Sequence, residues 1–138
     1  MRPASRRTGR RGNAAVEFAM TLPLLLLIVS AILDYGWYLS QAANVMHSVR
    51  EGARYGATLA QDDSPDSGAV DQTEAALRAL GIDCGGLATC SVNASIGFTG
   101  GLNSLEVQAE IAYVPLMGIV PTPSVVQGSM TMALEDQG

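Results

Sequence analysis

The stretch Arg10-Arg11-Gly12-Asn13-Ala14-Ala15-Val16-Glu17-Phe18 opens an apolar run that continues without a charge to Leu33. Basic residues crowd the first dozen positions, as Arg2, Arg6, Arg7, Arg10 and Arg11. A basic cluster followed by small residues, one acid and a long apolar run is typical of a segment that enters a membrane. This stretch therefore decides how the remainder of the chain is organised.

The apolar run is long enough to cross a bilayer once its flanks are included. A crossing needs about 20 mostly apolar residues, and residues 14–16 and 35–38 extend the run 18–33 at its two ends. Tyr and Trp at positions 35–38 favour the headgroup level, and the basic cluster favours the cytoplasm. We therefore predict a transmembrane helix over residues 13–38, a basic leader over 1–12, and an exported domain over 39–138.

Glu17 is an acid at the start of this predicted membrane helix. A carboxylate costs about 2.5–3.5 kcal/mol at a membrane helix centre and less near the interface. One interpretation is a carboxylate solvated among headgroups beside Arg11. The other is functional: if the chain were cut after Gly12, Glu17 would lie one helical turn from a new amine on Asn13. The two charges could then pair within one chain or between neighbouring chains.

The N-terminal sequence resembles a known family. Gly12, then four residues, then Glu17 and the aromatic Phe18 look like the processing signature of type IV prepilins. The longer pattern resembles the TadE-like pseudopilins of the tight-adherence pilus system, and it consists of Arg11-Gly12-Asn13-Ala14-Ala15-Val16-Glu17-Phe18-Ala19, Leu22-Pro23-Leu24-Leu25-Leu26-Leu27, Asp34-Tyr35-Gly36 and Arg50-Glu51-Gly52-Ala53-Arg54-Tyr55. Two positions depart from the family pattern. Asp34 stands where Glu is commoner in the family, and Ser48-Val49 precede Arg50 where small alanine residues are usual.

This resemblance implies a site and a set of partners. A prepilin peptidase would cut between Gly12 and Asn13, and Glu17 with Phe18 would set subunit register through the new amine. The protein would span the bacterial inner membrane once, with a cytoplasmic N-terminus and a periplasmic domain, and could enter an extracellular pilus. Its partners would be other pilins or pseudopilins and the pilus assembly platform. No cofactor, small-molecule substrate or nucleic acid is implied, and no enzymatic activity.

Two other fates of the N-terminus remain open. The basic region, the apolar run and Val29-Ser30-Ala31 also fit a secretory signal cut after Ala31. Without any cut, the chain would be a signal-anchored periplasmic binding or scaffold domain unrelated to pili. Pro23 removes a backbone donor, so we expect it to kink the membrane helix locally.

The exported domain begins with two predicted helices. Small and branched apolar residues recur at spacings of three and four over residues 39–60, which predicts a continuation of the first helix. Gly52 and Gly56 either admit another backbone or weaken the helix end. The charges at 50–54 indicate either a solvated helix face or a subunit contact. Residues 61–68 are predicted as a loop, and residues 69–80 as a helix that buries Val70, Ala76, Leu77 and Leu80 before Gly81.

The remainder of the domain predicts a small sheet. Apolar residues alternate with polar ones over 92–98, 105–113 and 126–134, which is typical of half-buried antiparallel strands. Three strands after two helices predict an α+β fold. Cys84 and Cys90 flank a short loop, and we predict a disulfide rather than free thiols because the domain is exported. The apolar stretch 116–120 is predicted to tuck into the core, with the membrane leaflet or a partner as alternatives.

Composition excludes several classes of function. The net charge is -5, and beyond Tyr38 acids outnumber the three arginines, which argues against binding nucleic acid. A metal site is not expected, because His47 is the only histidine. Asp62, Asp63 and Asp66 offer hard oxygen ligands, but their spacing fits no EF-hand and favours a solvated turn. We find no catalytic set of residues in the sequence.

Overall fold

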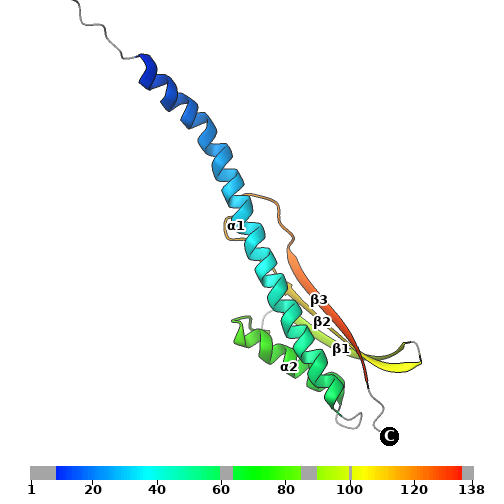
Figure 1. The fold of residues 1–138 in the computed structure, drawn as a ribbon. Helices are drawn as coiled ribbons and strands as arrows, with labels where there is room; N and C mark the ends of the chain where they lie inside the picture. Colours follow the sequence, from blue (N-terminus) through cyan, green and yellow to red (C-terminus); the bar gives the residue numbers. More distant parts are fainter. Residues whose placement is uncertain (1–8, 60–63, 85–89, 100, 135–138) are drawn as a thin grey trace, which may run out of the picture.

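Two helices and three strands make up the chain in the computed structural model, which describes residues 9–59, 64–84, 90–99 and 101–134. In chain order they are α1 (Gly9–Thr58), α2 (Pro65–Ala79), β1 (Cys90–Thr99), β2 (Leu102–Ala112) and β3 (Val125–Ala133). Figure 1 shows a long α1 that runs past the sheet and continues well beyond it. The predicted α+β class, with a long first helix, a short second helix and three strands, is confirmed.

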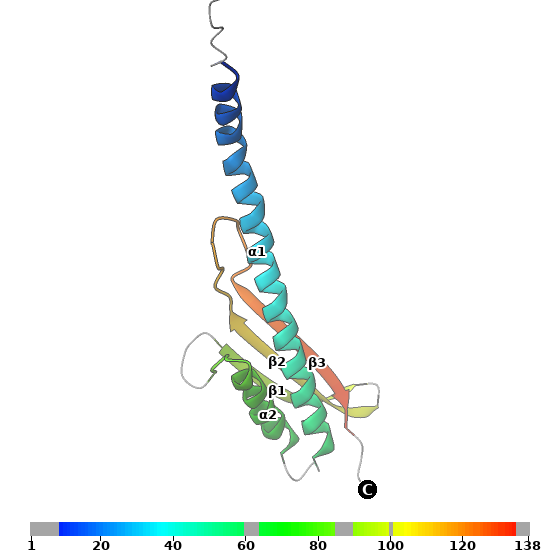
Figure 2. The same cartoon turned by 60° about the vertical axis from the view of Figure 1, so that its left-hand side comes forward.

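The sheet is an antiparallel meander with strand order β1-β2-β3. In register, Val107 pairs with Ala94 of β1 and with Met130 of β3. Both helices lie on the same face of the sheet, so its strands bury alternate side chains and leave the opposite face open (Figure 2). The core residues are Val45, Val49, Ala53, Ala69, Leu77, Leu105, Val107, Ala109, Ile111, Tyr113, Val126 and Leu134.

Two glycines allow α2 to pack directly on α1. A methyl group at Gly52 would lie 2.6 Å from the carbonyl oxygen of Ala69, and one at Gly56 would lie 2.7 Å from the carbonyl oxygen of Pro65. Contacts this short leave no room for a side chain, so only glycine fits at both positions. Of the two interpretations of this glycine pair, close approach of another backbone is therefore the one observed.

The second helix differs from its prediction at its start and on its inner face. It begins at Pro65, although the sequence 61–68 indicates a loop. Proline is well tolerated in a first helical turn because its missing N–H has no partner there. Leu77 is buried as expected, but Leu80 is exposed, and Ala69 and Thr73 take the inward positions instead. Gly81 has a positive φ of 81° and ends the helix as predicted.

The connection between β2 and β3, which we call the apolar loop (residues 113–124), leaves the core after Tyr113. Leu116, Met117 and Ile119 are 59%, 54% and 62% exposed, so the expectation that residues 116–120 enter the core is wrong. The apolar loop leaves the end of the sheet and extends along α1 toward its N-terminal half (Figures 1 and 2). The helices and strands already fill the core, which leaves these side chains outside it.

Candidate functional site

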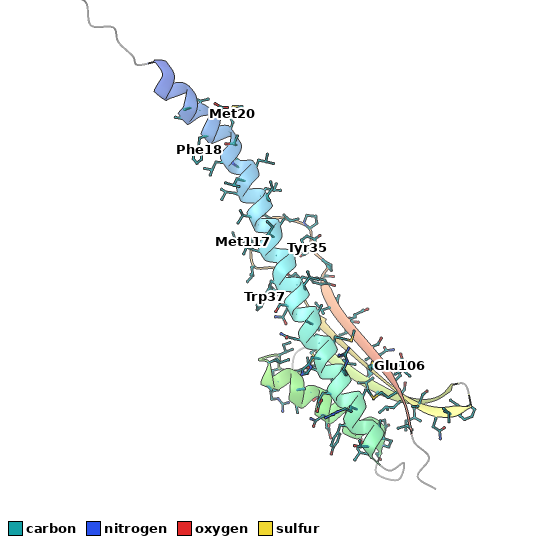
Figure 3. All side chains as sticks on the ribbon, viewed as in Figure 1. Phe18, Met20, Tyr35, Trp37, Glu106 and Met117 are labelled. Carbon is teal, nitrogen blue, oxygen red and sulfur yellow. A yellow bond between two sulfur atoms is a disulfide. The ribbon has the colours of Figure 1, made fainter. Side chains whose placement is uncertain are left out.

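The N-terminal part of α1 is a helix against which no other described part of the chain packs. Every residue over 14–29, which we call the bare segment, is exposed, including Phe18, Met20 and five consecutive large apolar residues at 24–28. Figure 3 shows Phe18 and Met20 projecting from α1 far from the sheet. Among the described residues, α1 is the one helix long and apolar enough to cross a membrane, with a mean hydropathy of 2.3. Such a helix is compatible with a single-pass membrane anchor.

The residues of the predicted processing site lie near the start of α1. Gly12 and Asn13 are in helical backbone, and Glu17 follows one turn after Asn13. Glu17 is exposed, and it forms no hydrogen bond or ion pair with the side chains that the structure describes. Any charge that pairs with it must therefore come from the region before residue 14 or from another molecule.

Phe18 and Pro23 lie further along the bare segment. The Phe18 side chain is 61% exposed, and its carbonyl oxygen accepts a hydrogen bond from the Thr21 hydroxyl. Helix α1 continues through Pro23 without interruption. A kink at Pro23 and a role of Phe18 in subunit register stay predictions.

Asp34, which belongs to the Asp34-Tyr35-Gly36 pattern in the sequence, forms a contact that the sequence did not predict. Its side chain is fully buried although it lies in the exposed half of α1. One carboxylate oxygen accepts a hydrogen bond from the backbone N–H of Met117 at 2.8 Å, and the other accepts one from Gly118 at 3.1 Å. Asp34 therefore holds the tip of the apolar loop against α1, across more than eighty positions of sequence.

Two tyrosines strengthen this connection. The Tyr113 hydroxyl donates to the backbone carbonyl of Asp34 at 2.6 Å, and the Tyr35 hydroxyl donates to the carbonyl of Pro121 at 3.1 Å. The Tyr113 ring also packs edge-to-face on Tyr38, with ring centroids 5.2 Å apart. Burial raises the pKa of the Tyr113 hydroxyl, and the nearby negative charge of Asp34 raises it further.

Gly118 completes the geometry of the loop tip. It has a positive φ of 66°, a conformation that glycine adopts without strain, and its N–H thereby faces Asp34. An isolated acid at the end of an apolar helix, together with a glycine inside a distant apolar loop, is the only sequence signal for this contact. Neither residue identifies the other, so the pair could not be found from the sequence.

The predicted disulfide is present between Cys84 and Cys90, with Cα atoms 5.0 Å apart. It joins the segment after α2 to the first residue of β1. The intervening residues 85–89 lie outside the described part of the chain. The bond thus fixes α2 next to the edge of the sheet that it covers.

The charged and metal-ligating residues form no further site within the described ranges. His47 is exposed, and no cluster of three His, Cys, Asp or Glu residues suited to a metal is found there. Asp66 lies in the first turn of α2, whereas Asp62 and Asp63 fall outside the described residues. Arg54 and Glu51 form an exposed ion pair at 3.6 Å within α1, so these charges lie on a solvated face of the helix in this chain, and a subunit contact there stays a prediction.

Comparison with known proteins places the similarity in α1. No curated protein and no solved structure matches the chain. A family match covers the bare segment, Asp34 and the first turns that pack on the sheet, and it ends before α2. Residues 12–54 match the model of the TadE-like protein family, which confirms the resemblance drawn from the sequence.

Proposed function

We propose that this protein is a membrane-anchored pseudopilin that takes part in the assembly or initiation of a tight-adherence pilus. The family match supports a role in such a system, because TadE-like proteins are structural, pilus-associated proteins rather than enzymes. The observation that carries the proposal is the bare segment, in which Glu17 pairs with no side chain that the structure describes. A helix that is apolar on all sides requires lipid or other helices around it.

In the proposed mechanism, the protein first spans the inner membrane with its N-terminus in the cytoplasm. The leader 1–12 holds that end at the cytoplasmic surface through its five arginines. Prepilin peptidase then cuts between Gly12 and Asn13 and removes all five positive charges. The helix thereby loses the basic anchor that opposes its movement toward the periplasm.

The cut also creates the partner for Glu17. The amine of Asn13 in one subunit pairs with the Glu17 carboxylate of a neighbour, so both charges are tolerated among apolar helices. Because the pair forms in only one axial position, it sets the register of adjacent subunits, and Phe18 packs beside it. The folded domain, held on α1 by the core, supplies contacts to other pilins and to the assembly platform.

The first experiment is the intact mass and N-terminal sequence of the protein purified from its native membranes. We expect a mature chain that begins at Asn13 and that disappears when the peptidase is deleted. A chain beginning at Ile32 would indicate a released soluble domain. An uncut chain would indicate a signal-anchored binding or scaffold domain, and either result would contradict the proposed processing.

The second experiment tests the role of Glu17. Glu17→Gln keeps the shape of the side chain but removes its charge, so we expect normal membrane insertion and cleavage with at least a tenfold loss of pili (about 1.4 kcal/mol in a pairing equilibrium). Glu74→Gln on α2 is the matched control and should assemble normally. Normal piliation of the Glu17→Gln strain would show that the charge does not set register.

A further inference from the structure

The apolar loop and α1 together define how deep the folded domain lies relative to the membrane. The bare segment covers about 24 Å at 1.5 Å per residue, which is shorter than the roughly 30 Å of a hydrocarbon core. About 20 residues are needed, so a span that starts at Ala14 ends at Leu33. A span that starts after Glu17 ends near Trp37. The membrane boundary therefore falls between Leu33 and Trp37, within about one helical turn of Asp34.

Asp34 is also the residue that holds the tip of the apolar loop. Because Met117 and Gly118 donate their N–H groups to its carboxylate, the loop tip lies at the same level of α1 as the membrane boundary. Figure 3 shows Met117, Tyr35 and Trp37 around this part of the helix. Tyr35 and Trp37 are 44% and 40% exposed, as expected for aromatic residues at a headgroup level.

The composition of the apolar loop fits an apolar solvent. It carries no charged residue, and its large exposed side chains are those of Val114, Leu116, Met117 and Ile119, beside the smaller exposed Pro121, Pro123 and Ser124. Three prolines in the loop lack an N–H, which reduces the number of donors that lipid could not satisfy. The two N–H groups at the tip are satisfied by Asp34, and the buried carboxylate receives two donors in return.

We propose that the apolar loop inserts into the lipid leaflet on the domain side of the membrane, and that Asp34 is the positioning residue that holds it there. This inference rests on the membrane anchoring proposed above. The loop thereby gives the domain a second attachment beside α1, which fixes its height and limits its rotation about the helix axis. The partner is the lipid surface itself, at the boundary between headgroups and acyl chains.

The test uses single-tryptophan reporters in the full chain, reconstituted in liposomes that contain lipids brominated along their acyl chains, both near the headgroup and near the chain end. Trp37→Phe removes the one native tryptophan. Met117→Trp then reports on the loop, Leu24→Trp on the bare segment, and Phe98→Trp on the far end of the β1–β2 hairpin, where the side chain is 74% exposed. Bromine quenches only tryptophan that lies within the lipid.

We expect Leu24→Trp and Met117→Trp to be quenched, with the loop reporter quenched at least about fivefold more strongly than Phe98→Trp, as for a side chain at the interface. Quenching of Leu24→Trp alone would overturn the loop insertion while leaving the anchor intact. A blue-shifted but unquenched Met117→Trp would indicate a protein partner and would also overturn it. An unquenched Leu24→Trp would overturn both the anchor and this inference.

The role of Asp34 is tested by adding Asp34→Ala to the Met117→Trp chain. Loss of the carboxylate frees the loop tip, so we expect at least a twofold drop in quenching with unchanged quenching of Leu24→Trp. Asp71→Ala on the exposed face of α2 is the control and should change neither signal. Unchanged loop quenching in a folded Asp34→Ala chain would show that the carboxylate does not position the loop. Should this variant misfold, the reporter comparison above still decides whether the loop inserts.

Discussion

The two halves of α1 form one continuous helix but have opposite surroundings. Over residues 14–29 the helix is rich in leucine and exposed on every side, whereas from Val45 to Gly56 it is buried on one face, and that face is built of valine, alanine, serine and glycine. Large apolar residues occur where the surroundings come from outside the chain. Small residues occur where α2 and the sheet approach closely. Residue size along one helix therefore distinguishes its external contacts from its internal ones.

The largest effect that separates the halves is expected at glycine. Gly56→Ala places a methyl group 2.7 Å from the backbone of Pro65 and against the Leu105 side chain, so we expect a loss of about 3 kcal/mol in the free energy of unfolding. Urea unfolding in detergent, followed by near-ultraviolet circular dichroism, measures it.

The matched control for this change is Gly36→Ala. A methyl group there meets no atom within 4 Å, so alanine should leave stability unchanged or raise it by up to about 1 kcal/mol. Equal losses at both glycines would mean that helix propensity, and not the close approach of α2, explains the pair.

A smaller effect is expected for one chemical change made in both halves. Val49→Ala removes two methyl groups from a fully buried side chain, and we expect it to cost about 2 kcal/mol of unfolding free energy. Val16→Ala makes the same change at a side chain that is 60% exposed, and it should not alter domain unfolding. The difference between the two variants, measured by the same urea titration, cancels the helix propensity of alanine. A difference near zero would contradict the division of α1.

The smallest effect concerns Tyr113, which contacts α1 at Asp34, between the two halves. The pKa of Tyr113 is raised above its ordinary value of 10.0 by burial and by Asp34, so the folded protein prefers the neutral hydroxyl. Its contribution to stability is complete below pH 10.0 and is lost as the pH rises through the raised pKa of the folded state. Tyr113→Phe should abolish this alkaline loss, as measured by unfolding at a series of alkaline pH values. An identical pH dependence in the Phe variant would assign the loss to another group.

Much of this architecture follows from local pattern. Alternation over 92–98, 105–113 and 126–134 predicts three strands because one face of each is buried, and all three are present. Long helical periodicity predicts α1, and Cys84 and Cys90 predict their bond correctly. The loop prediction over residues 61–68 is wrong at Pro65, because proline breaks a helix in its interior but is a favourable first residue of one. The start of α2 is therefore misplaced.

The sequence could not reveal the contacts that depend on distant partners. The apolar sequence at 116–120 indicates that these side chains favour surroundings other than water. It does not show whether those surroundings are the protein core or lipid. Asp34 and Gly118 lie more than eighty positions apart, so only the fold brings them together. The pairing of Glu17 with a freed amine on Asn13, by contrast, is predicted from the sequence and stays a prediction. Local pattern thus predicts elements well and long-range polar contacts poorly.

The distribution of contacts along α1 has a mechanical consequence. The domain is attached from Asp34, through the core valines, to Gly56, a length of about 33 Å at 1.5 Å per residue. A pull along the helix axis loads all of these contacts together in shear, whereas a sideways pull would peel them apart one after another. Force applied to the N-terminal end of α1 is therefore carried into the folded domain as a whole. The domain and the helix then move together as one rigid body.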